Sequence, residues 1–321
     1  MAKMAKTSKR SRTATARDNG VMSIKSLLNP ATSTSKRATI RYLRRESFLV
    51  TGSPYVRMTN FEPFPDGRTP AQPDDVPNLH IQDVRELHVG EQPQLRTHGF
   101  SIQLFAPIFP RKPFEEDMVT PEVINECFAR VNRLVWAKVA LLESKVADWE
   151  LRYGPPGYGR MGPEDIPGVE LPMHQPYADK FGLVGFDELA HNWPEKFGQR
   201  KAGDHWGILK FWVPLVDKGD ERVTNWPLTI CSPNTVARRR DFERGEIQLG
   251  GQIETTHMTY YNPNHKWHFL SMQSGCQVWY WVLWDSDSEL PQNVMVSTFD
   301  TGVGDQKRMS LEFKVYVKYR E

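Results

Sequence analysis

The stretch that decides the fold runs from 207 to 312 and holds five short motifs in a fixed order. They are Lys210–Leu215 (KFWVPL), Trp226–Leu228 (WPL), Tyr261–Trp267 (YNPNHKW), Thr298–Asp300 (TFD) and Arg308–Glu312 (RMSLE). Short apolar and aromatic runs recur through this stretch and beyond it, at Ile208–Leu215, Thr229–Ser232, Thr255–Tyr261, Trp267–Ser271, Val278–Trp284, Val294–Phe299 and Leu311–Tyr319. Strands at this density, with little helix between them, predict an all-β barrel or jelly roll.

The chain before this stretch is more varied. Ile40–Val56 predicts extended structure, and the proline-rich Phe61–Pro77 excludes a helix. His80–Glu86 and Thr97–Phe105 alternate well enough to predict strands. A long amphipathic helix is expected near 120–146. Thr120 can cap it, Pro121 suits its first position, and apolar residues follow at helical spacing as far as Leu142. The Gly- and Pro-rich loop Tyr153–Pro172 is a candidate pocket rim.

Composition limits the class of protein. The 321 residues are 39% hydrophobic, which supports one large domain or at most two small ones. No apolar run approaches the roughly 20 residues of a membrane helix, and the basic N-terminus lacks the apolar core of a secretory signal. Cys127, Cys231 and Cys276 show neither zinc spacing nor a disulfide framework, as expected in a reducing cytosol. We therefore expect a cytoplasmic protein with no membrane partner.

The N-terminus differs in charge from the rest of the chain. Residues 1–45 hold twelve Lys/Arg and one acid, a balance of +11; the total is +2, so the remainder carries −9. Nucleic-acid binding through Lys9–Arg12 (KRSR) is one interpretation. A disordered solubilising arm over 1–36 is favoured, because this segment has too few large apolar residues to pack. We expect a second unit, 37–321, to be the folded domain, with no nucleic-acid partner.

The order of the motifs resembles the CmcJ/NvfI-like family, also called AsaB-like or gibberellin-desaturase-like. Asp83-Val84-Arg85 and Gly99-Phe100 match further family motifs, so the resemblance extends from about Thr39 to the C-terminus. It implies a mainly β fold, a double-stranded β-helix (jelly roll) with flanking α-helices. Members of the family are Fe(II)/2-oxoglutarate oxygenases, many of them in fungal natural-product pathways.

The metal ligands that the resemblance implies are mostly replaced. The family's His-x-Asp pair matches His174-Gln175-Pro176, and its second His matches Val296. Proline and valine offer no donor atom, whereas a facial triad needs two imidazoles and one carboxylate. We therefore expect neither iron nor another cofactor. The alternative is a working Fe(II)/2-oxoglutarate hydroxylase or desaturase with unusual ligands, for instance His174, Asp179 and His257.

The family's Arg-x-Ser, which holds the 2-oxoglutarate carboxylate, matches Arg308 and Ser310. Two interpretations stay open. Arg308 pairs with an internal acid such as Glu312 or Asp300, or it still binds an acidic or enolic oxygen of a small molecule, where a bidentate guanidinium is a strong partner.

These residues suggest a site for an enzyme without metal. Candidate catalytic residues are His174 or His268 as acid/base and Arg308 as oxyanion clamp; Ser310 and Val296 are candidate lining residues, with Tyr177, Trp212 and Trp267 as walls. The expected substrate is a hydrophobic or polycyclic small molecule, and the expected reaction is dehydration followed by cyclisation or cycloaddition, as in a hetero-Diels–Alderase. A ligand-binding protein without catalysis is a further alternative, and exposed strand edges make a homodimer plausible.

Overall fold

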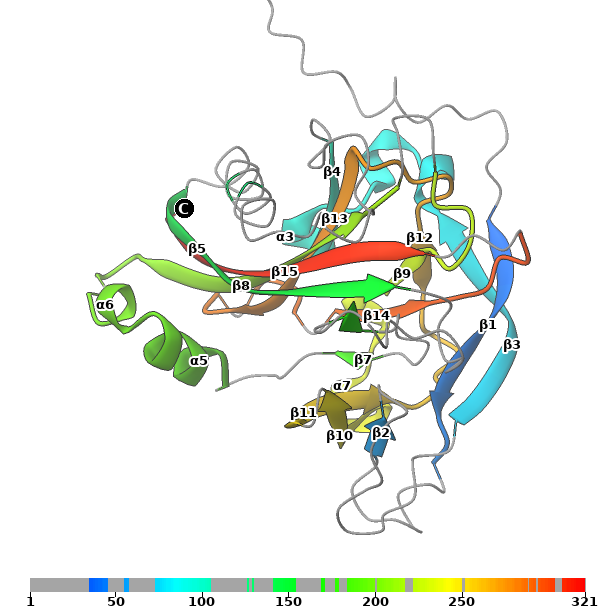
Figure 1. The fold of residues 1–321 in the computed structure, drawn as a ribbon, viewed down its shortest axis with the longest axis horizontal. Helices are drawn as coiled ribbons and strands as arrows, with labels where there is room; N and C mark the ends of the chain where they lie inside the picture. Colours follow the sequence, from blue (N-terminus) through cyan, green and yellow to red (C-terminus); the bar gives the residue numbers. More distant parts are fainter. Residues whose placement is uncertain are drawn as a thin grey trace, which may run out of the picture.

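The computed structural model describes residues 35–45, 55–57, 73–104, 126, 129, 141–153, 169–170, 177–178, 184–199, 201–216, 222–249, 252–287, 289–292, 294–303 and 308–320. Their strands form two sheets (Figure 1). Sheet A has nine strands in the order β1-β3-β12-β9-β14-β7-β11-β10-β2, and sheet B has six in the order β4-β13-β8-β15-β5-β6. The predicted mainly β architecture is confirmed.

The strands of sheet A are β1 (Lys36–Leu43), β2 (Tyr55–Arg57), β3 (Pro73–Asp83), β7 (Tyr177–Ala178), β9 (Leu228–Cys231), β10 (Phe242–Leu249), β11 (Gln252–Thr259), β12 (Trp267–Phe269) and β14 (Met295–Thr298). Those of sheet B are β4 (Phe100–Leu104), β5 (Leu141–Tyr153), β6 (Val169–Glu170), β8 (His205–Pro214), β13 (Gln277–Asp285) and β15 (Met309–Tyr319). The helices are α3 (Leu95–His98), α5 (Val184–Asn192), α6 (Pro194–Phe197) and α7 (Arg238–Asp241), with 3-10 turns at Val84–Glu86, Val89–Glu91 and Pro233–Thr235.

Among the described residues, one apolar cluster joins the two sheets. Ile208 and Trp212 of β8 contribute from sheet B, and Leu228, Ile230 and Val296 contribute from sheet A. Since side chains alternate along a strand, the residues between them on β8, such as those at 209, 211 and 213, face the other way and belong to a separate cluster. The face of each sheet that meets the shared cluster is called the interior face below.

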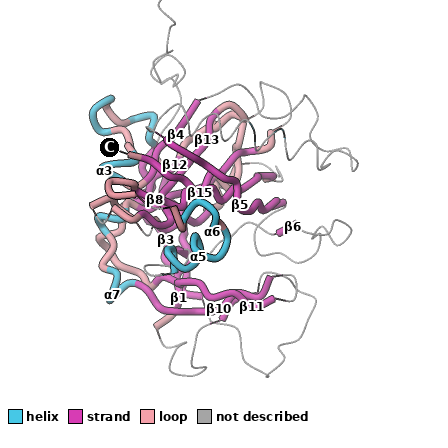
Figure 2. Tube along the Cα trace, turned by 90° about the vertical axis from the view of Figure 1, so that its left-hand side faces the viewer, coloured by secondary structure: helices cyan, strands magenta, loops and turns pink. Residues whose placement is uncertain are grey.

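Two short helices cover one end of this core. In Figure 1, α5 and α6 lie beside the end of β8, and Figure 2 shows them across the end of the barrel. The Trp193 and Trp206 rings meet edge to face at 5.8 Å, and Phe197 packs on Trp206 at 5.2 Å. Aromatic contacts of this geometry add to the area they bury, so this end of the barrel is closed by packing. No helix among the residues listed above is long and apolar enough to span a membrane.

Strand β3 shows how the proline-rich segment is used. Pro77 falls at an irregularity where the pairing with β1 shifts between Ala38 and Ile40, and Asn78 has a φ of 59°. Pro lacks a backbone donor and is tolerated in strands at such bulges, while Asn adopts positive φ more readily than most residues. The expected strand His80–Glu86 therefore begins earlier, and it ends in a 3-10 turn at Val84.

Four expectations need correction. The helix expected over 120–146 ends before 146, because strand β5 begins at Leu141. Of residues 120–140, only Glu126 and Ala129 are described, and both are helical. Thr97 and His98 end helix α3, so the strand there starts at Phe100. The folded domain begins before 37, since Lys36 pairs with Ile81. The expected loop Tyr153–Pro172 is interrupted by strand β6 at Val169–Glu170, and Tyr153 ends β5. The rest of that loop and residues 1–34 of the predicted basic arm lie outside the described residues.

Candidate active site

A row of side chains crosses the interior face of sheet A. His268 of β12 is paired with Ile230 of β9, Ile230 with Val296 of β14, and Val296 with Tyr177 of β7. Directly opposed residues on neighbouring strands share a face of the sheet. The register therefore places His268, Ile230 and Val296 side by side. It also places Tyr177, three residues after His174, next to Val296. His174, Pro176 and Asp179 themselves lie outside the described residues.

The donor set of this row does not fit a facial triad. Val296 is 3% exposed and carries no ligand atom, and its buried neighbour Ile230 carries none either. Within the described ranges, no three His, Cys, Asp or Glu side chains gather closely enough to hold a metal. His257 is paired with Ala178, one position along from Tyr177, so it leaves the opposite face of sheet A from Val296. The other two members of the alternative ligand set, His174 and Asp179, lie outside the described residues, so that set stays a prediction.

Arg308 lies at the interior face of sheet B and is 3% exposed. Its guanidinium stands over the Trp212 ring, 5.4 Å from the centroid, and its Nη1 donates a hydrogen bond to the Trp226 carbonyl oxygen at 3.0 Å. Trp226 has a φ of 50°, a left-handed conformation that costs about 1–3 kcal/mol for a residue with a Cβ. The Asn225 side chain holds this turn by accepting from the Trp226 N–H at 2.9 Å. The WPL motif thus presents a carbonyl to Arg308, a role that its sequence did not reveal.

His268 is held by a hydrogen bond and an aromatic neighbour. Its Nε2 lies 3.0 Å from the Ser232 hydroxyl, and its ring lies 5.7 Å from that of Phe100. Burial, followed by the positive charges of His98 and Lys266, lowers the pKa of His268 to about 4. The imidazole is therefore neutral near pH 7, which suits a proton acceptor or a hydrogen-bond partner better than a cationic acid.

The structure does not bring all the candidate residues together. His268 and Arg308 are separated by aromatic side chains. Phe100, next to His268, lies 6.0 Å from the ring of Trp279. Trp279 is paired in the sheet with Trp212, which lies under Arg308. Ser310 is fully buried and lies two residues from Arg308, on the same face of the sheet. The catalytic candidates of the two sheets therefore face one aromatic layer from opposite sides.

Trp267 is not part of this layer. It belongs to a separate cluster with Tyr42 and Phe269, and its Nε1 donates to the Tyr42 hydroxyl at 2.8 Å. That hydroxyl lies 3.2 Å from Nδ1 of His265, whose Nε2 lies 3.2 Å from Asp241. The YNPNHKW motif thus fastens β12 to β1 and α7, and Trp267 is not placed as a wall of the site.

One close pair of charges was missed from the sequence. The Lys210 ammonium lies 2.9 Å from a carboxylate oxygen of Glu312, with both side chains 4% exposed. Lys210 lies between Ile208 and Trp212 on β8, and Glu312 is the direct partner of Trp212. Both therefore face the interior. The signal was Lys210 within an apolar run of β8 and Glu312 among the alternating residues of β15, and it can be interpreted only once the strands are paired.

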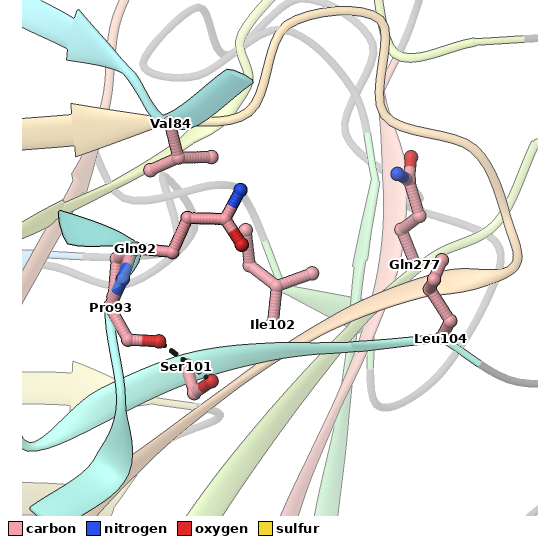
Figure 3. Close-up of a pocket in the computed structure, with 7 residues that line it drawn as sticks. All are labelled: Val84, Gln92, Pro93, Ser101, Ile102, Leu104 and Gln277. Carbon is pink, nitrogen blue, oxygen red and sulfur yellow. Dashed lines mark hydrogen bonds between the residues drawn. The ribbon is translucent and has the colours of Figure 1, made fainter. Parts of the chain in front are cut away.

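A small recess lies at the edge of sheet B (Figure 3). Its lining is largely apolar and includes Ile102 and Leu104 of β4, with Gln277 at the start of β13. The Ser101 hydroxyl, which lies in the same region, donates to the Pro93 carbonyl at 2.9 Å. The cavity volume is about 30 Å³, room for a water molecule. This recess is too small to be the site of a polycyclic substrate.

Comparisons with known proteins bear on the fold. The family model described as "Oxidoreductase/YMDC permease-like domain" matches residues 41–318. Among solved structures, a variant of the iron and alpha-ketoglutarate-dependent endoperoxidase NvfI has a TM-score of 0.70 at 20% identity, covering 90% of this chain and 99% of that chain. NvfI in a different conformation has a TM-score of 0.66 at 19% identity, covering 90% of this chain and 100% of that chain. No curated protein matches this chain.

These similarities confirm the fold inferred from the motif order. The core is the double-stranded β-helix, or jelly roll, of Fe/2-oxoglutarate oxygenases, and NvfI-type enzymes are its structural neighbours. At this level of identity the likeness concerns the fold. The chemistry of this chain must be argued from its own residues.

Proposed function

Because the chain belongs to the oxidoreductase/YMDC permease-like domain family, we propose that it is a small-molecule enzyme that uses an oxygenase barrel for metal-independent dehydration and cyclisation. The observation that carries this proposal is the nature of two buried residues, Val296 and Arg308. The first puts a buried aliphatic side chain at the position of a family metal ligand, and the second keeps a buried cation on the facing sheet. Arg308 is the proposed oxyanion clamp. The described ranges hold no group of three His, Cys, Asp or Glu side chains that could bind a metal, and His174 and Asp179 lie outside those ranges.

The proposed reaction needs no oxidant. A hydroxyl leaves a benzylic or allylic carbon as water while a phenol or enol loses its proton, which gives a quinone methide or an equivalent enone. An alkene then adds across this diene, forming one C–C and one C–O bond. Arg308 stabilises the anionic oxygen, and the aromatic layer around Trp212 and Phe100 fixes the orientation of the two partners. His268 or His174 is the proposed proton acceptor.

The substrate is proposed to be an oxygenated, largely apolar molecule of natural-product metabolism, processed without Fe(II) or 2-oxoglutarate. An apolar lining with a few convergent polar groups is typical of small-molecule sites. The protein would carry out this reaction in the cytoplasm, as a monomer or a homodimer, with no nucleic acid or membrane required.

An assay with an alkyl-substituted 2-hydroxybenzyl alcohol and ethyl vinyl ether tests the proposal. The expected product is a chroman formed faster than in buffer and with one enantiomer in excess. A racemic product at the buffer rate would contradict the proposal. Succinate release with added Fe(II) and 2-oxoglutarate would instead support the oxygenase alternative. Saturable binding of the alcohol without turnover would support a ligand-binding protein.

A further inference from the structure

The Lys210–Glu312 ion pair is a costly feature of the barrel interior. Both side chains are 4% exposed and their charged atoms are 2.9 Å apart. Removing two charges from water is expensive, and a buried pair is often no more stable than apolar residues of similar volume at the same positions. The flanking residues of β8, Ile208 and Trp212, show that this face accepts apolar side chains. Stability therefore gives little reason for a lysine and a glutamate here.

The pair lies beside the proposed site. Glu312 is the direct partner of Trp212, and the Arg308 guanidinium covers the Trp212 ring at 5.4 Å. On the other side, Lys210 is the direct partner of Trp281 on β13. The ion pair and Arg308 thus occupy one continuous band of the interior face, separated by a single indole.

Buried donors in this band can bind an oxygen-bearing molecule. Trp212, Trp279 and Ser310 are fully buried, and their Nε1 or Oγ atoms have no hydrogen-bond partner among the described residues. An indole N–H can only donate, and a buried polar group without a partner is costly. Two indoles on neighbouring strands can therefore donate to acceptor oxygens, such as the carbonyl, phenol or enol groups of a substrate.

We propose that Lys210 and Glu312 form the proton-transfer pair of this site, acting on a substrate that carries a phenol or enol and a leaving hydroxyl. This inference rests on the proposed dehydration. The Lys210 ammonium gives its proton to the hydroxyl as the C–O bond breaks, releasing water. The Glu312 carboxylate takes the phenol or enol proton. Transfer of that proton from Glu312 to the neutral Lys210 amine then restores the ion pair, so charge and protons balance.

In this scheme Glu312 replaces the histidine as the proton acceptor, and Lys210 supplies the acid that the histidine of the facing sheet cannot. A neutral His268 can accept a proton but has none to give as a cation near pH 7. An ammonium held by a carboxylate remains a proton donor, and the carboxylate is an adjacent base. The site then has the acid Lys210 and the base Glu312 at one end, and the oxyanion clamp Arg308 at the other.

A paired substitution separates catalysis from stability. Lys210→Met alone and Glu312→Gln alone leave one partner buried without the other, and they are expected to lower the melting temperature. The double variant Lys210→Met/Glu312→Leu should recover that temperature. Its kcat on the 2-hydroxybenzyl alcohol should fall about 10²–10⁴-fold, the usual contribution of general acid–base catalysis, with KM little changed. Recovery of both stability and turnover would overturn the proposal.

A matched control uses the neighbouring lysine of sheet B. Lys314 of β15 is the direct partner of Lys210, but its ammonium pairs with Glu188 of α5 at 3.2 Å, where the two side chains are 29% and 19% exposed. Lys314→Met should leave turnover at the wild-type rate. An equal loss of turnover in Lys314→Met and Lys210→Met would show a general charge effect and contradict a specific role for Lys210.

A binding readout keeps the inference separate from the proposed function. We expect 4-nitrophenol, whose phenolate is yellow, to bind wild-type protein partly as the phenolate in a buffer where the free probe is colourless. The double variant Lys210→Met/Glu312→Leu should change the bound phenolate fraction, whatever the turnover of the wild type. An identical fraction in both proteins, or no binding to the wild type, would overturn the proposed pair. Binding with the expected change but no wild-type turnover would refute the dehydration alone.

Discussion

At the scale of single residues, the positions of Arg308 and Trp226 depend on each other. Trp226 holds a left-handed backbone conformation, and such strain persists only where the surroundings determine it. Asn225 accepts from the N–H groups of both Trp226 and Thr301, at 2.9 and 3.2 Å. The strained turn directs a carbonyl at the guanidinium and so fixes the orientation of Arg308.

Arg308→Ala is expected to reduce turnover or ligand affinity by about one to three orders of magnitude, because it removes a charge-assisted hydrogen bond from a dry site. Arg308→Lys keeps the charge but not the planar fork, and should recover only part of the loss. Steady-state kinetics and circular dichroism measure both effects. A folded Arg308→Ala variant with wild-type kinetics would make Arg308 a structural residue.

The pH dependence of turnover tests whether a histidine, His268 or His174, acts as the base in place of Glu312. The pKa of His268 is lowered to about 4, so this residue loses its proton well below the ordinary histidine range. If His268 is the base, kcat/KM should fall only as the pH drops towards 4, and His268→Gln should remove that limb. An inflection near the ordinary histidine pKa of about 6.5 that disappears in His174→Ala, but not in His268→Ala, would assign the role to His174.

At the scale of elements, helix α5 is fitted to the barrel by a glycine. A Cβ on Gly185 would overlap the indole of Trp284 on β13, and Phe186 packs against the same indole with ring centroids 4.6 Å apart. The helix therefore approaches the strand more closely than a side chain at 185 would allow. This close approach seals the end of the interior that holds Trp206 and Tyr316.

Gly185→Ala should destabilise the protein by about 1–3 kcal/mol, since the added methyl group must displace a large buried ring. Thermal unfolding measures the effect. Gly90→Ala is the matched control, because a Cβ at Gly90 meets nothing within 4 Å, and it should stay within about 0.5 kcal/mol of the wild type. Equal melting temperatures for the two variants would mean that α5 does not press on Trp284.

At the scale of the whole molecule, one buried carboxyl links folding to pH. Asp285, at the end of β13, accepts a hydrogen bond from the Tyr319 hydroxyl at 2.8 Å. Burial raises its pKa from 3.8 to about 7, and the nearby charge of Asp287 acts in the same direction. Between these two values the folded protein binds more protons at this site than the unfolded chain. The contribution of Asp285 to stability is therefore full below about pH 4 and is lost as the pH rises to 7.

Asp285→Asn should remove this dependence, because an amide cannot ionise and its oxygen can still accept from Tyr319. The difference in unfolding free energy between variant and wild type should grow in favour of the variant as the pH rises from about 4 to about 7. A shift of about three pKa units sets an upper limit of about 4 kcal/mol. Urea unfolding at several pH values measures it. A difference that does not change with pH would show that Asp285 ionises normally in the folded state.

The sequence by itself predicted the architecture and matched Val296 to a family ligand position. Short β-rich runs predicted a barrel because strands and turns leave local signals, and the order of the motifs identified the oxygenase fold. Val296 could be matched to a ligand position from the motif alone. The register of β7, β9, β12 and β14 then placed it beside Ile230 and Tyr177, in line with His268. Local patterns also misled, since helical spacing extended the expected helix to 146, into strand β5, whose pairing with β15 overrides it.

Only the tertiary structure decided which side chains share a space. Trp267 and His268 are adjacent in sequence, yet alternation along β12 sends one towards Tyr42 and the other towards Phe100. Lys210 and Glu312 are far apart in the sequence, and they meet because β8 and β15 pair in one register. A strand's faces follow from its sequence, but its neighbours depend on loop closures and packing across the whole chain. The composition of the interior site is therefore a property of the assembled barrel.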